Sequence, residues 1–257
     1  MNLERPPVRT VKPAHPTNCI PSTNPMIDQP VVGESVEMYL KSIYELQQLE
    51  SPVLISLLAR RMGVSSPAAV EMVKRMASKG WVEHIPYKGV QLTERGQKRA
   101  LSVIRRHRLW ERFLQDKLGL PWEKVHDYAC RMEHTTAPEV ADALEAFLGF
   151  PKTCPHGNPI PTKEGVIAEN ETIPLSDVEQ DQVVRVDHIA YEETILLDYL
   201  AKRQIFPGTV LALDEIEPYQ GPLVLRIGQG ENERPVSLGR EIASRIFVQA
   251  ENLSKNH

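Results

Sequence analysis

Residues 55–92 read ISLLARRMGVSSPAAVEMVKRMASKGWVEHIPYKGVQL, and this stretch decides the fold of the N-terminal half. Apolar residues recur at helical spacing in 55–61 and again in 67–79, and Gly80 is typical of a helix end. Two short apolar segments around a Pro-Tyr-Lys-Gly turn in residues 81–92 predict a β-hairpin. Two helices joined by a tight turn and followed by a hairpin predict a winged helix-turn-helix unit.

The second helix of this unit, which Ser66 is expected to cap, presents small residues at its N-terminus. In a helix-turn-helix unit such residues read base edges in the major groove, while nearby basic residues contact phosphates. Glu71 can accept a hydrogen bond from the amino group of cytosine, or it is a solvated residue that repels phosphate. The expected DNA-binding residues are Arg60, Ser65, Ser66, Pro67, Ala68, Glu71, Lys74, Arg75 and Lys88.

Composition and charge favour a nucleic-acid-binding domain joined to at least one other. The 257 residues suggest two domains, and a hydrophobic content of 41% is enough for buried cores. Residues 35–106 contain twelve Lys/Arg and six Asp/Glu, whereas residues 167–217 contain three and twelve. There is no run of 18 apolar residues, no signal-peptide core and no CxxC spacing among the three cysteines. The sequence therefore argues against membrane spans and a disulfide framework and predicts a cytoplasmic location.

A helix is predicted upstream, over residues 35–50, and a tail precedes it. Residues 1–33 contain seven prolines and little periodic pattern, which is typical of a disordered or extended segment. The buried stripe of the predicted helix consists of Val36, Leu40, Ile43, Leu46 and Leu49.

Downstream, Thr93 is expected to cap a long helix that ends near Leu118. His107 and Glu111 lie four residues apart on this helix and therefore share a face. Such a pair is most often simply solvated. The next helix is predicted to begin at Pro121.

This next helix carries the run His126-Asp-Tyr-Ala-Cys130-Arg-Met-Glu133-His134. A helix turns about 100° per residue, so the two histidines, the cysteine and the glutamate lie on one face. Imidazole, thiolate and carboxylate on one stripe predict a site for a divalent transition metal. A buried core cysteine, a solvated glutamate and incidental histidines would give the same pattern.

The remainder divides into a helix, a linker and a β-rich segment. Thr136-Ala-Pro-Glu139 fits a capping box for a helix over 138–148, whose apolar face is a candidate dimer interface. The linker, residues 150–174, contains Cys154 and His156, a weak ligand pair that is not expected to bind metal. Short strands with Gly and Pro turns predict a small β-barrel from residue 175 onward, with strands at 183–186, 209–213, 223–227 and 245–248 and a helix at 192–202.

These joined motifs resemble the diphtheria-toxin-repressor family of metal-dependent transcriptional regulators. The resemblance covers residues 34–250 and rests on EMYLKSIY (37–44), RHRLWE (106–111), VHDYACRMEH (125–134) and GNPIP (157–161), in the family's order and spacing. It implies a mainly α fold with α+β parts, and a homodimer that binds a palindromic operator in double-stranded DNA. The implied parts are a tail (1–33), a winged helix-turn-helix domain (34–98), a helical metal-binding and dimerisation domain (99–150), a linker (151–174), an SH3-like, FeoA-type domain (175–250) and a second tail (251–257).

The resemblance also implies two metal ions per subunit. The positions that match the regulatory site are Met38, Cys130, Glu133 and His134, and those that match the ancillary site are His107, Glu111, His126 and Glu193. At two positions the sequence differs from the family's pattern, which limits what the resemblance implies. Leu196 stands where a further ancillary ligand is expected and cannot coordinate, and Glu71 stands where iron-regulated members have Gln, so no operator preference is implied.

Cys130 and Met38 resemble the iron-responsive branch, because manganese sensors carry carboxylates at both positions. Sulfur ligands favour softer ions than Mn²⁺, so Fe²⁺ is the expected ion and Mn²⁺ the alternative. Two other classes fit the residues less well. A metallohydrolase would need an open metal position and a general base, for which no motif is present. A winged-helix regulator that senses an organic ligand would leave the donor stripe with a structural role.

Overall fold

The structure is a computed structural model and describes residues 33–168, 170–190, 192–228 and 233–251. Apart from residue 33, the predicted N-terminal tail lies outside the described residues, as do residues 252–257. None of the helices in the described part has the length and apolar character needed to cross a membrane.

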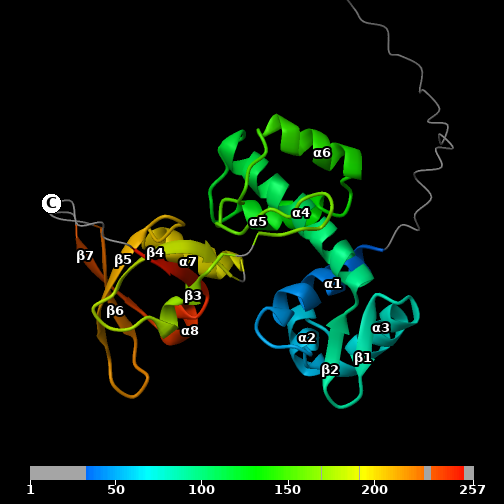
Figure 1. The fold of residues 1–257 in the computed structure, drawn as a ribbon, viewed down its shortest axis with the longest axis horizontal. Helices are drawn as coiled ribbons and strands as arrows, with labels where there is room; N and C mark the ends of the chain where they lie inside the picture. The colour runs from blue at the N-terminus through cyan, green and yellow to red at the C-terminus, as the bar shows by residue number, and fades with distance from the viewer. Residues whose placement is uncertain (1–32, 169, 191, 229–232, 252–257) are drawn as a thin grey trace, which may run out of the picture. The chain divides into compact units, whose positions relative to one another are not determined.

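The N-terminal part is a winged helix-turn-helix unit, as predicted (Figure 1). Its elements are α1 (Glu34–Gln47), α2 (Ile55–Met62), α3 (Ser66–Ser78), β1 (Val82–Ile85) and β2 (Gly89–Leu92). Ser65, not Ser66, is the N-cap of α3, because its side chain accepts a 3.4 Å hydrogen bond from the Ala68 N–H. Leu49 lies beyond the end of α1 and is exposed, so the predicted buried stripe ends one turn earlier.

The wing is a short antiparallel hairpin in which Val82 pairs with Leu92 and Ile85 with Gly89. Gly89 has φ +134°, and a Cβ atom there would lie 2.1 Å from the Val53 carbonyl oxygen. Only glycine therefore permits this close approach of the wing to the segment before α2. The approach also fixes the hairpin against the helices, since the Val53 and Val90 backbones exchange hydrogen bonds of 2.8 and 2.9 Å.

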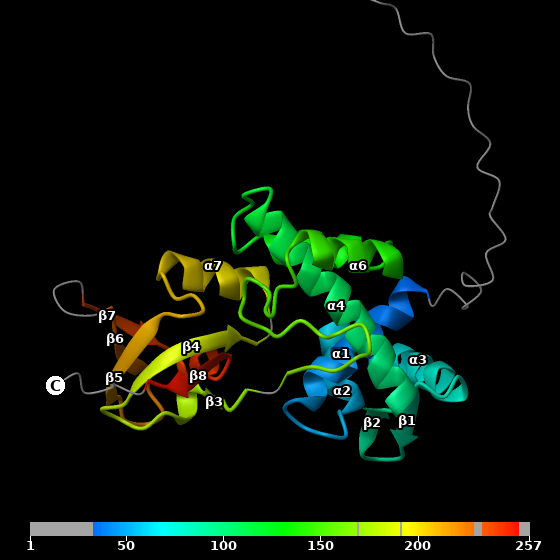
Figure 2. The same ribbon diagram turned by 45° about the horizontal axis from the view of Figure 1, so that its top comes forward.

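Three helices follow: α4 (Glu94–Asp116), α5 (Val125–Met132) and α6 (Pro138–Phe147). Leu109 of α4 packs with Ala141 and Leu144 of α6, and the two helices lie side by side in Figures 1 and 2. Thr93 caps α4, as predicted, through a 3.1 Å hydrogen bond from the Gly96 N–H.

Two details of this helical region differ from the prediction. α5 begins at Val125 rather than at Pro121 and ends at Met132, so Glu133 and His134 follow the helix. α6 has no side-chain cap, because the Thr136 hydroxyl instead donates to the Met132 carbonyl and accepts a 2.7 Å hydrogen bond from Trp110 Nε1. The capping-box prediction is therefore wrong.

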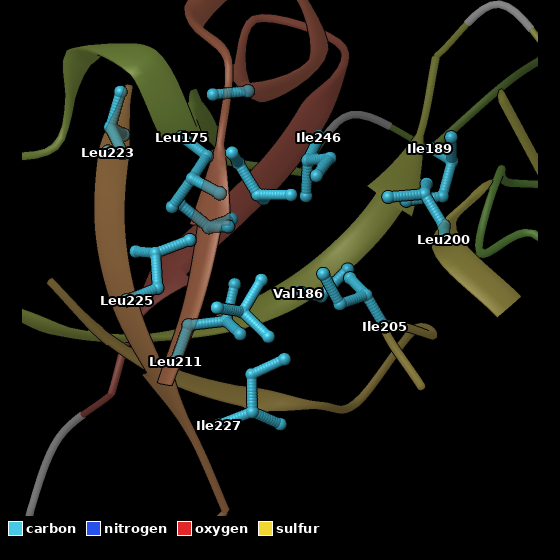
Figure 3. Close-up of a cluster of buried hydrophobic side chains, with 14 of the residues drawn as sticks. Leu175, Val186, Ile189, Leu200, Ile205, Leu211, Leu223, Leu225, Ile227 and Ile246 are labelled. Carbon is cyan, nitrogen blue, oxygen red and sulfur yellow. The ribbon is translucent and has the colours of Figure 1, made fainter. Parts of the chain in front are cut away.

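The C-terminal part is a six-stranded antiparallel sheet with strand order β3-β8-β4-β5-β6-β7. Its elements are β3 (Ile173–Pro174), η1 (Leu175–Asp177), β4 (Val183–Ile189), α7 (Thr194–Lys202), β5 (Val210–Ile216), β6 (Leu223–Ile227), β7 (Arg234–Leu238), α8 (Arg240–Ala243) and β8 (Ile246–Ala250). The sequence missed β3 and β7. Alternating strand residues such as Val186, Leu211 and Leu225 form one apolar core with Leu200 of α7 (Figure 3).

Candidate metal centre

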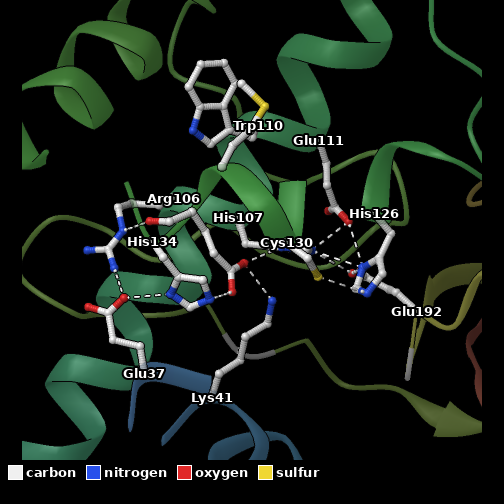
Figure 4. A network of polar contacts seen from close by, with 12 residues as sticks. Glu37, Lys41, Arg106, His107, Trp110, Glu111, His126, Cys130, His134 and Glu192 are labelled. Atoms are coloured by element: carbon white, nitrogen blue, oxygen red, sulfur yellow. Dashed lines mark hydrogen bonds and ion pairs between the residues drawn. The ribbon is translucent and has the colours of Figure 1, made fainter. Parts of the chain in front are cut away.

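The long helix α4 and the shorter α5 bring the first group of donors together. His107 and Glu111 are buried one turn apart on α4, with 2.9 Å between His107 Nε2 and Glu111 Oε1. His126 Nδ1, from α5, lies 3.1 Å from His107 Nε2 and 3.3 Å from Glu111 Oε1. Glu192, from the C-terminal part, adds an Oε2 atom 3.2 Å from His126 Nδ1 (Figure 4). One donor atom from each of the four residues lies within 4.8 Å of all the others.

The carboxylate in this group is Glu192 and not Glu193, the residue assigned from the sequence. Glu193 is 56% exposed, and its Oε1 lies 3.4 Å from Arg61 Nη1 and 3.6 Å from Arg245 Nη1. Glu193 has extended backbone angles, and in extended chain successive side chains point to opposite sides. Only one of two adjacent glutamates can therefore face the histidines. Leu196 is buried in the apolar core and contributes no ligand.

A second group of candidate metal ligands adjoins the first. It contains Cys154 and His156, the pair in the predicted linker that was not expected to bind metal. His156 Nδ1 lies 3.2 Å from Glu111 Oε1, and Cys154 Sγ lies 3.6 Å from Glu192 Oε1. Glu111, Cys154, His156 and Glu192 form a group within 4.8 Å, so the two groups share both carboxylates. The structure thus places Cys154 and His156 among the candidate ligands. Their Cys-Pro-His spacing was the available signal.

The donors assigned to the regulatory site lie around the end of α5. Cys130 Sγ lies 3.5 Å from His126 Nε2 and groups with His107 and His126. Within the described residues, no group within 4.8 Å combines Cys130 with Glu133 and His134. Met38 is half-buried on α1, between Glu37 and Lys41. The sequence reasoning missed both of these α1 neighbours, which contact the donors directly.

Glu133 and His134 each have one side-chain atom in contact with a residue of α1 and a second atom that faces the other residue. Glu133 Oε2 lies 2.9 Å from Lys41 Nζ and 2.5 Å from His107 Nδ1. His134 Nδ1 lies 2.8 Å from Glu37 Oε2. The remaining atoms, Glu133 Oε1 and His134 Nε2, face each other at 3.2 Å, and in the part of the chain that the structure describes neither has a hydrogen-bond partner.

These environments shift the protonation of the donors. Burial opposes a charge on His126, but its hydrogen bonds with Cys130, Glu111 and Glu192 raise its pKa to about 10. Burial likewise opposes a charge on His134, and contacts with Glu133 and Glu37 raise its pKa to about 9. For Cys130, burial would raise the pKa, but hydrogen bonds from His107 and His126 lower it to about 6. A thiolate is therefore available at neutral pH, while a cation that binds either imidazole must displace a proton.

The residues present fit a divalent transition metal. Four buried donor atoms have no hydrogen-bond partner among the described residues, namely Glu111 Oε2, Glu133 Oε1, His134 Nε2 and His156 Nδ1. A buried polar atom without a partner is costly, and here four of them gather in the same clusters. Nitrogen, sulfur and carboxylate donors in one place are the ligand set of Fe, Mn, Zn and related ions.

The predicted DNA-binding residues all lie at the surface. Arg60, Ser65 to Ala68, Glu71, Lys74, Arg75 and Lys88 are exposed on α2, on α3 with its cap, and on the wing. Tyr87, which the sequence reasoning missed, is fully exposed at the tip of the wing beside Lys88. The surface thus offers hydroxyl, basic and aromatic groups along one helix N-terminus and the adjoining hairpin.

Sequence profiles of known families match three consecutive parts of the chain. They are described as the iron dependent repressor N-terminal DNA binding domain (32–90), the iron dependent repressor metal binding and dimerisation domain (93–162) and the FeoA domain (173–250). Helices α1, α4 and α5 all fall within the first two.

Individual proteins agree with the profiles. The chain is 32% identical to the diphtheria toxin repressor of Corynebacterium diphtheriae over 226 residues, which are 84% of this chain and 97% of that protein. It is 41% identical to the iron-dependent repressor IdeR of Mycobacterium tuberculosis over 128 residues, so this alignment spans 50% of the chain and only 56% of IdeR. A solved structure described as a manganese-dependent transcriptional repressor in complex with manganese is 32% identical, with a TM-score of 0.78 over 84% of this chain and 100% of that one. The chain therefore belongs to the diphtheria-toxin-repressor family of metal-dependent transcriptional repressors.

Proposed function

We propose that this protein is an Fe²⁺-responsive repressor that binds a palindromic operator as a homodimer. The observation that carries the proposal is the meeting of α1, from the DNA-binding domain, with the donors at the end of α5. Lys41 and Glu37 of α1 contact Glu133 and His134 directly, and Met38 lies between them in sequence. A cation held by Met38, Cys130, Glu133 and His134 would therefore link the two domains.

The choice of Fe²⁺ follows from the donor chemistry. Met38 and Cys130 would supply sulfur ligands, which favour softer ions than Mn²⁺. The carboxylates Glu111 and Glu192 in the second cluster favour harder ions, and Mn²⁺ is therefore the alternative. Titration of anaerobic protein with each ion, followed by operator binding, tests the choice. We expect half-maximal operator binding at a lower free concentration of Fe²⁺ than of Mn²⁺, and the reverse order would assign the protein to manganese.

The ancillary metal position is proposed to use His107, Glu111, His126 and Glu192. Cys154 and His156 lie beside the same two carboxylates and extend this donor set. Asn158 Nδ2 donates a 2.5 Å hydrogen bond to Glu192 Oε1 and a 2.9 Å hydrogen bond to the Ile189 carbonyl oxygen. These contacts hold the carboxylate in place, as outer partners of metal ligands commonly do.

The homodimer is proposed to form through α6 and its flanks. Val140, Phe147 and Phe150 are 48%, 65% and 63% exposed, although they are large and apolar. Apolar patches of this kind mark interaction surfaces. Two subunits paired in this way would present two recognition helices to half-sites about one helical turn, or a multiple of it, apart.

The proposed switch is a population shift between arrangements of α1 and the end of α5. When bound, the metal supplies an electrostatic link between sulfur, carboxylate and imidazole donors of the two domains. A change in the position of α1 relative to the metal ligands would also move α2 and α3, because the three helices belong to one domain. Helix α3 is fixed in this domain by its buried residues Val73 and Met76. Coupling between two such sites is usually about 1–3 kcal/mol, and DNA must tighten metal binding by the same factor.

Met38→Ala tests this link. The side chain is half-buried on α1 and lies outside the set of buried core residues in the described part of the chain, so the variant should remain folded and dimeric. Operator binding should then need at least about fivefold more metal, the lower end of usual coupling factors. Fluorescence anisotropy of labelled operator at controlled metal concentration measures the shift. A variant that responds at the same metal concentration as wild type would show that Met38 does not link the domains.

A further inference from the structure

Two charged residues of α1, one helical turn apart, contact the regulatory donors from the side away from their free atoms. Glu37 Oε2 lies 2.8 Å from His134 Nδ1, and Lys41 Nζ lies 2.9 Å from Glu133 Oε2. Both α1 side chains are nearly excluded from solvent, at 11% and 7% exposure. Figure 4 shows them extending from α1 toward the donors.

The contact with Glu37 decides which nitrogen of His134 is available. A carboxylate at Nδ1 accepts the N–H from that atom and leaves the lone pair on Nε2, the nitrogen without a hydrogen-bond partner. An outer carboxylate also makes the imidazole a stronger base and a better ligand. Arg106 holds Glu37 in this position through a 3.0 Å contact from Nη2, and its Nε donates to the Glu133 carbonyl oxygen at 2.6 Å.

The contact with Lys41 acts in the opposite direction. Its ammonium group attracts the negative charge of the Glu133 carboxylate toward Oε2. Oε1 is therefore a weaker donor than it would be in a free carboxylate. A full positive charge beside the site also repels any cation that binds there, and in a buried position this repulsion is only partly screened. Glu133 keeps Lys41 charged, because its attraction raises the lysine pKa even though burial would lower it.

We propose that Glu37 and Lys41 are positioning residues that set the metal affinity of the Glu133–His134 site in opposite directions. Glu37 strengthens the His134 donor, and Lys41 weakens the Glu133 donor and opposes the incoming cation. The affinity would thus be held at an intermediate value by a balance that one helix of the DNA-binding domain supplies. This inference rests on the proposed function in one respect, the placement of a metal at Glu133 and His134.

The test uses Co²⁺ and the full-length chain with Cys19 and Cys154 replaced by serine. Cys130 is then the only thiol, so the thiolate-to-Co²⁺ absorption band reports a metal ion bound through Cys130. Titrations without DNA, corrected for the protons that the ligands release on binding, give the Co²⁺ dissociation constant. Removing an outer partner changes metal affinity by about 10–100-fold, so we expect Glu37→Gln to bind Co²⁺ about tenfold more weakly and Lys41→Gln about tenfold more tightly than the parent.

The opposite signs separate this proposal from a structural role, which would weaken binding in both variants. Glu94→Gln and Lys98→Gln, which break an exposed ion pair on α4, are the matched controls and should leave the constant unchanged. If Lys41→Gln does not fold, Lys41→Met keeps the apolar stem, removes the same charge and should also bind more tightly. Equal or weaker Co²⁺ binding by the Lys41 variant would overturn the proposal. A parent that shows no Cys130 charge-transfer band would instead overturn the proposed metal site.

Discussion

Replacement of His134 by alanine is expected to abolish metal-dependent operator binding while metal still binds at the ancillary position. The variant removes Nε2, which faces Glu133 Oε1 at 3.2 Å and has no other hydrogen-bond partner. It also releases Glu37 of α1 from the end of α5. Since loss of an outer partner alone costs about 10–100-fold in metal affinity, loss of a ligand should cost about 100-fold or more.

Isothermal titration and operator anisotropy measure the two consequences separately. His188→Ala is the matched control, because His188 is a partly buried histidine of the C-terminal sheet that pairs with Asp187 and stacks on Phe247. The control should bind metal and operator as wild type does. If His134→Ala retains operator binding at the wild-type metal concentration, His134 is not a regulatory ligand.

The second large effect on metal binding is expected at Glu192, whose neighbour Glu193 serves as the control. Glu192→Ala should remove metal from the ancillary position, because Glu192 contacts both His126 and His156 and belongs to two of the donor groups. We expect its loss to lower affinity there by at least about 100-fold, which is the upper end of the range for an outer partner. Glu193→Ala should leave metal binding unchanged, because Glu193 pairs with Arg61 and Arg245 and is mostly exposed.

Metal content after dialysis against a fixed free metal concentration distinguishes the two variants. A lower metal-to-protein ratio for Glu192→Ala, with a wild-type ratio for Glu193→Ala, is the expected result. An equal loss of metal in both variants, or a loss only in Glu193→Ala, would show that Glu193 is a ligand of the ancillary metal.

Local patterns explain why most of the fold was predictable. The helices and hairpin of residues 55–92 are specified by periodicity, Gly80 and the turn residues, all of which act within a few positions. Boundaries were less certain because neighbouring residues offer equivalent chemistry: Ser65 and Ser66 can both cap α3, and only the structure shows which hydroxyl contacts the Ala68 N–H. Strand β7 was missed because Pro235 and the polar residues around it hide its alternation.

The candidate metal ligands likewise divide into those that local spacing in the sequence predicts and those that it does not. His107 with Glu111, and His126 with Cys130, are spaced by one helical turn, so the sequence places each pair on one face. Glu192 lies 66 positions from His126, His156 lies 45 positions from Glu111, and Cys154 lies 38 positions from Glu192, so no local pattern encodes these contacts. Glu37 and Lys41 were missed for another reason, because charged residues beside an apolar stripe normally remain in solvent.

In the proposed switch, a metal held between α1 and the end of α5 permits operator binding. The most direct measurement is anisotropy of a labelled operator with one preparation of anaerobic protein, first stripped by chelator and then resupplied with Fe²⁺. We predict weak binding by the stripped protein and at least about fivefold tighter binding after resupply, in keeping with usual coupling factors. Equal operator affinity before and after resupply would contradict the account.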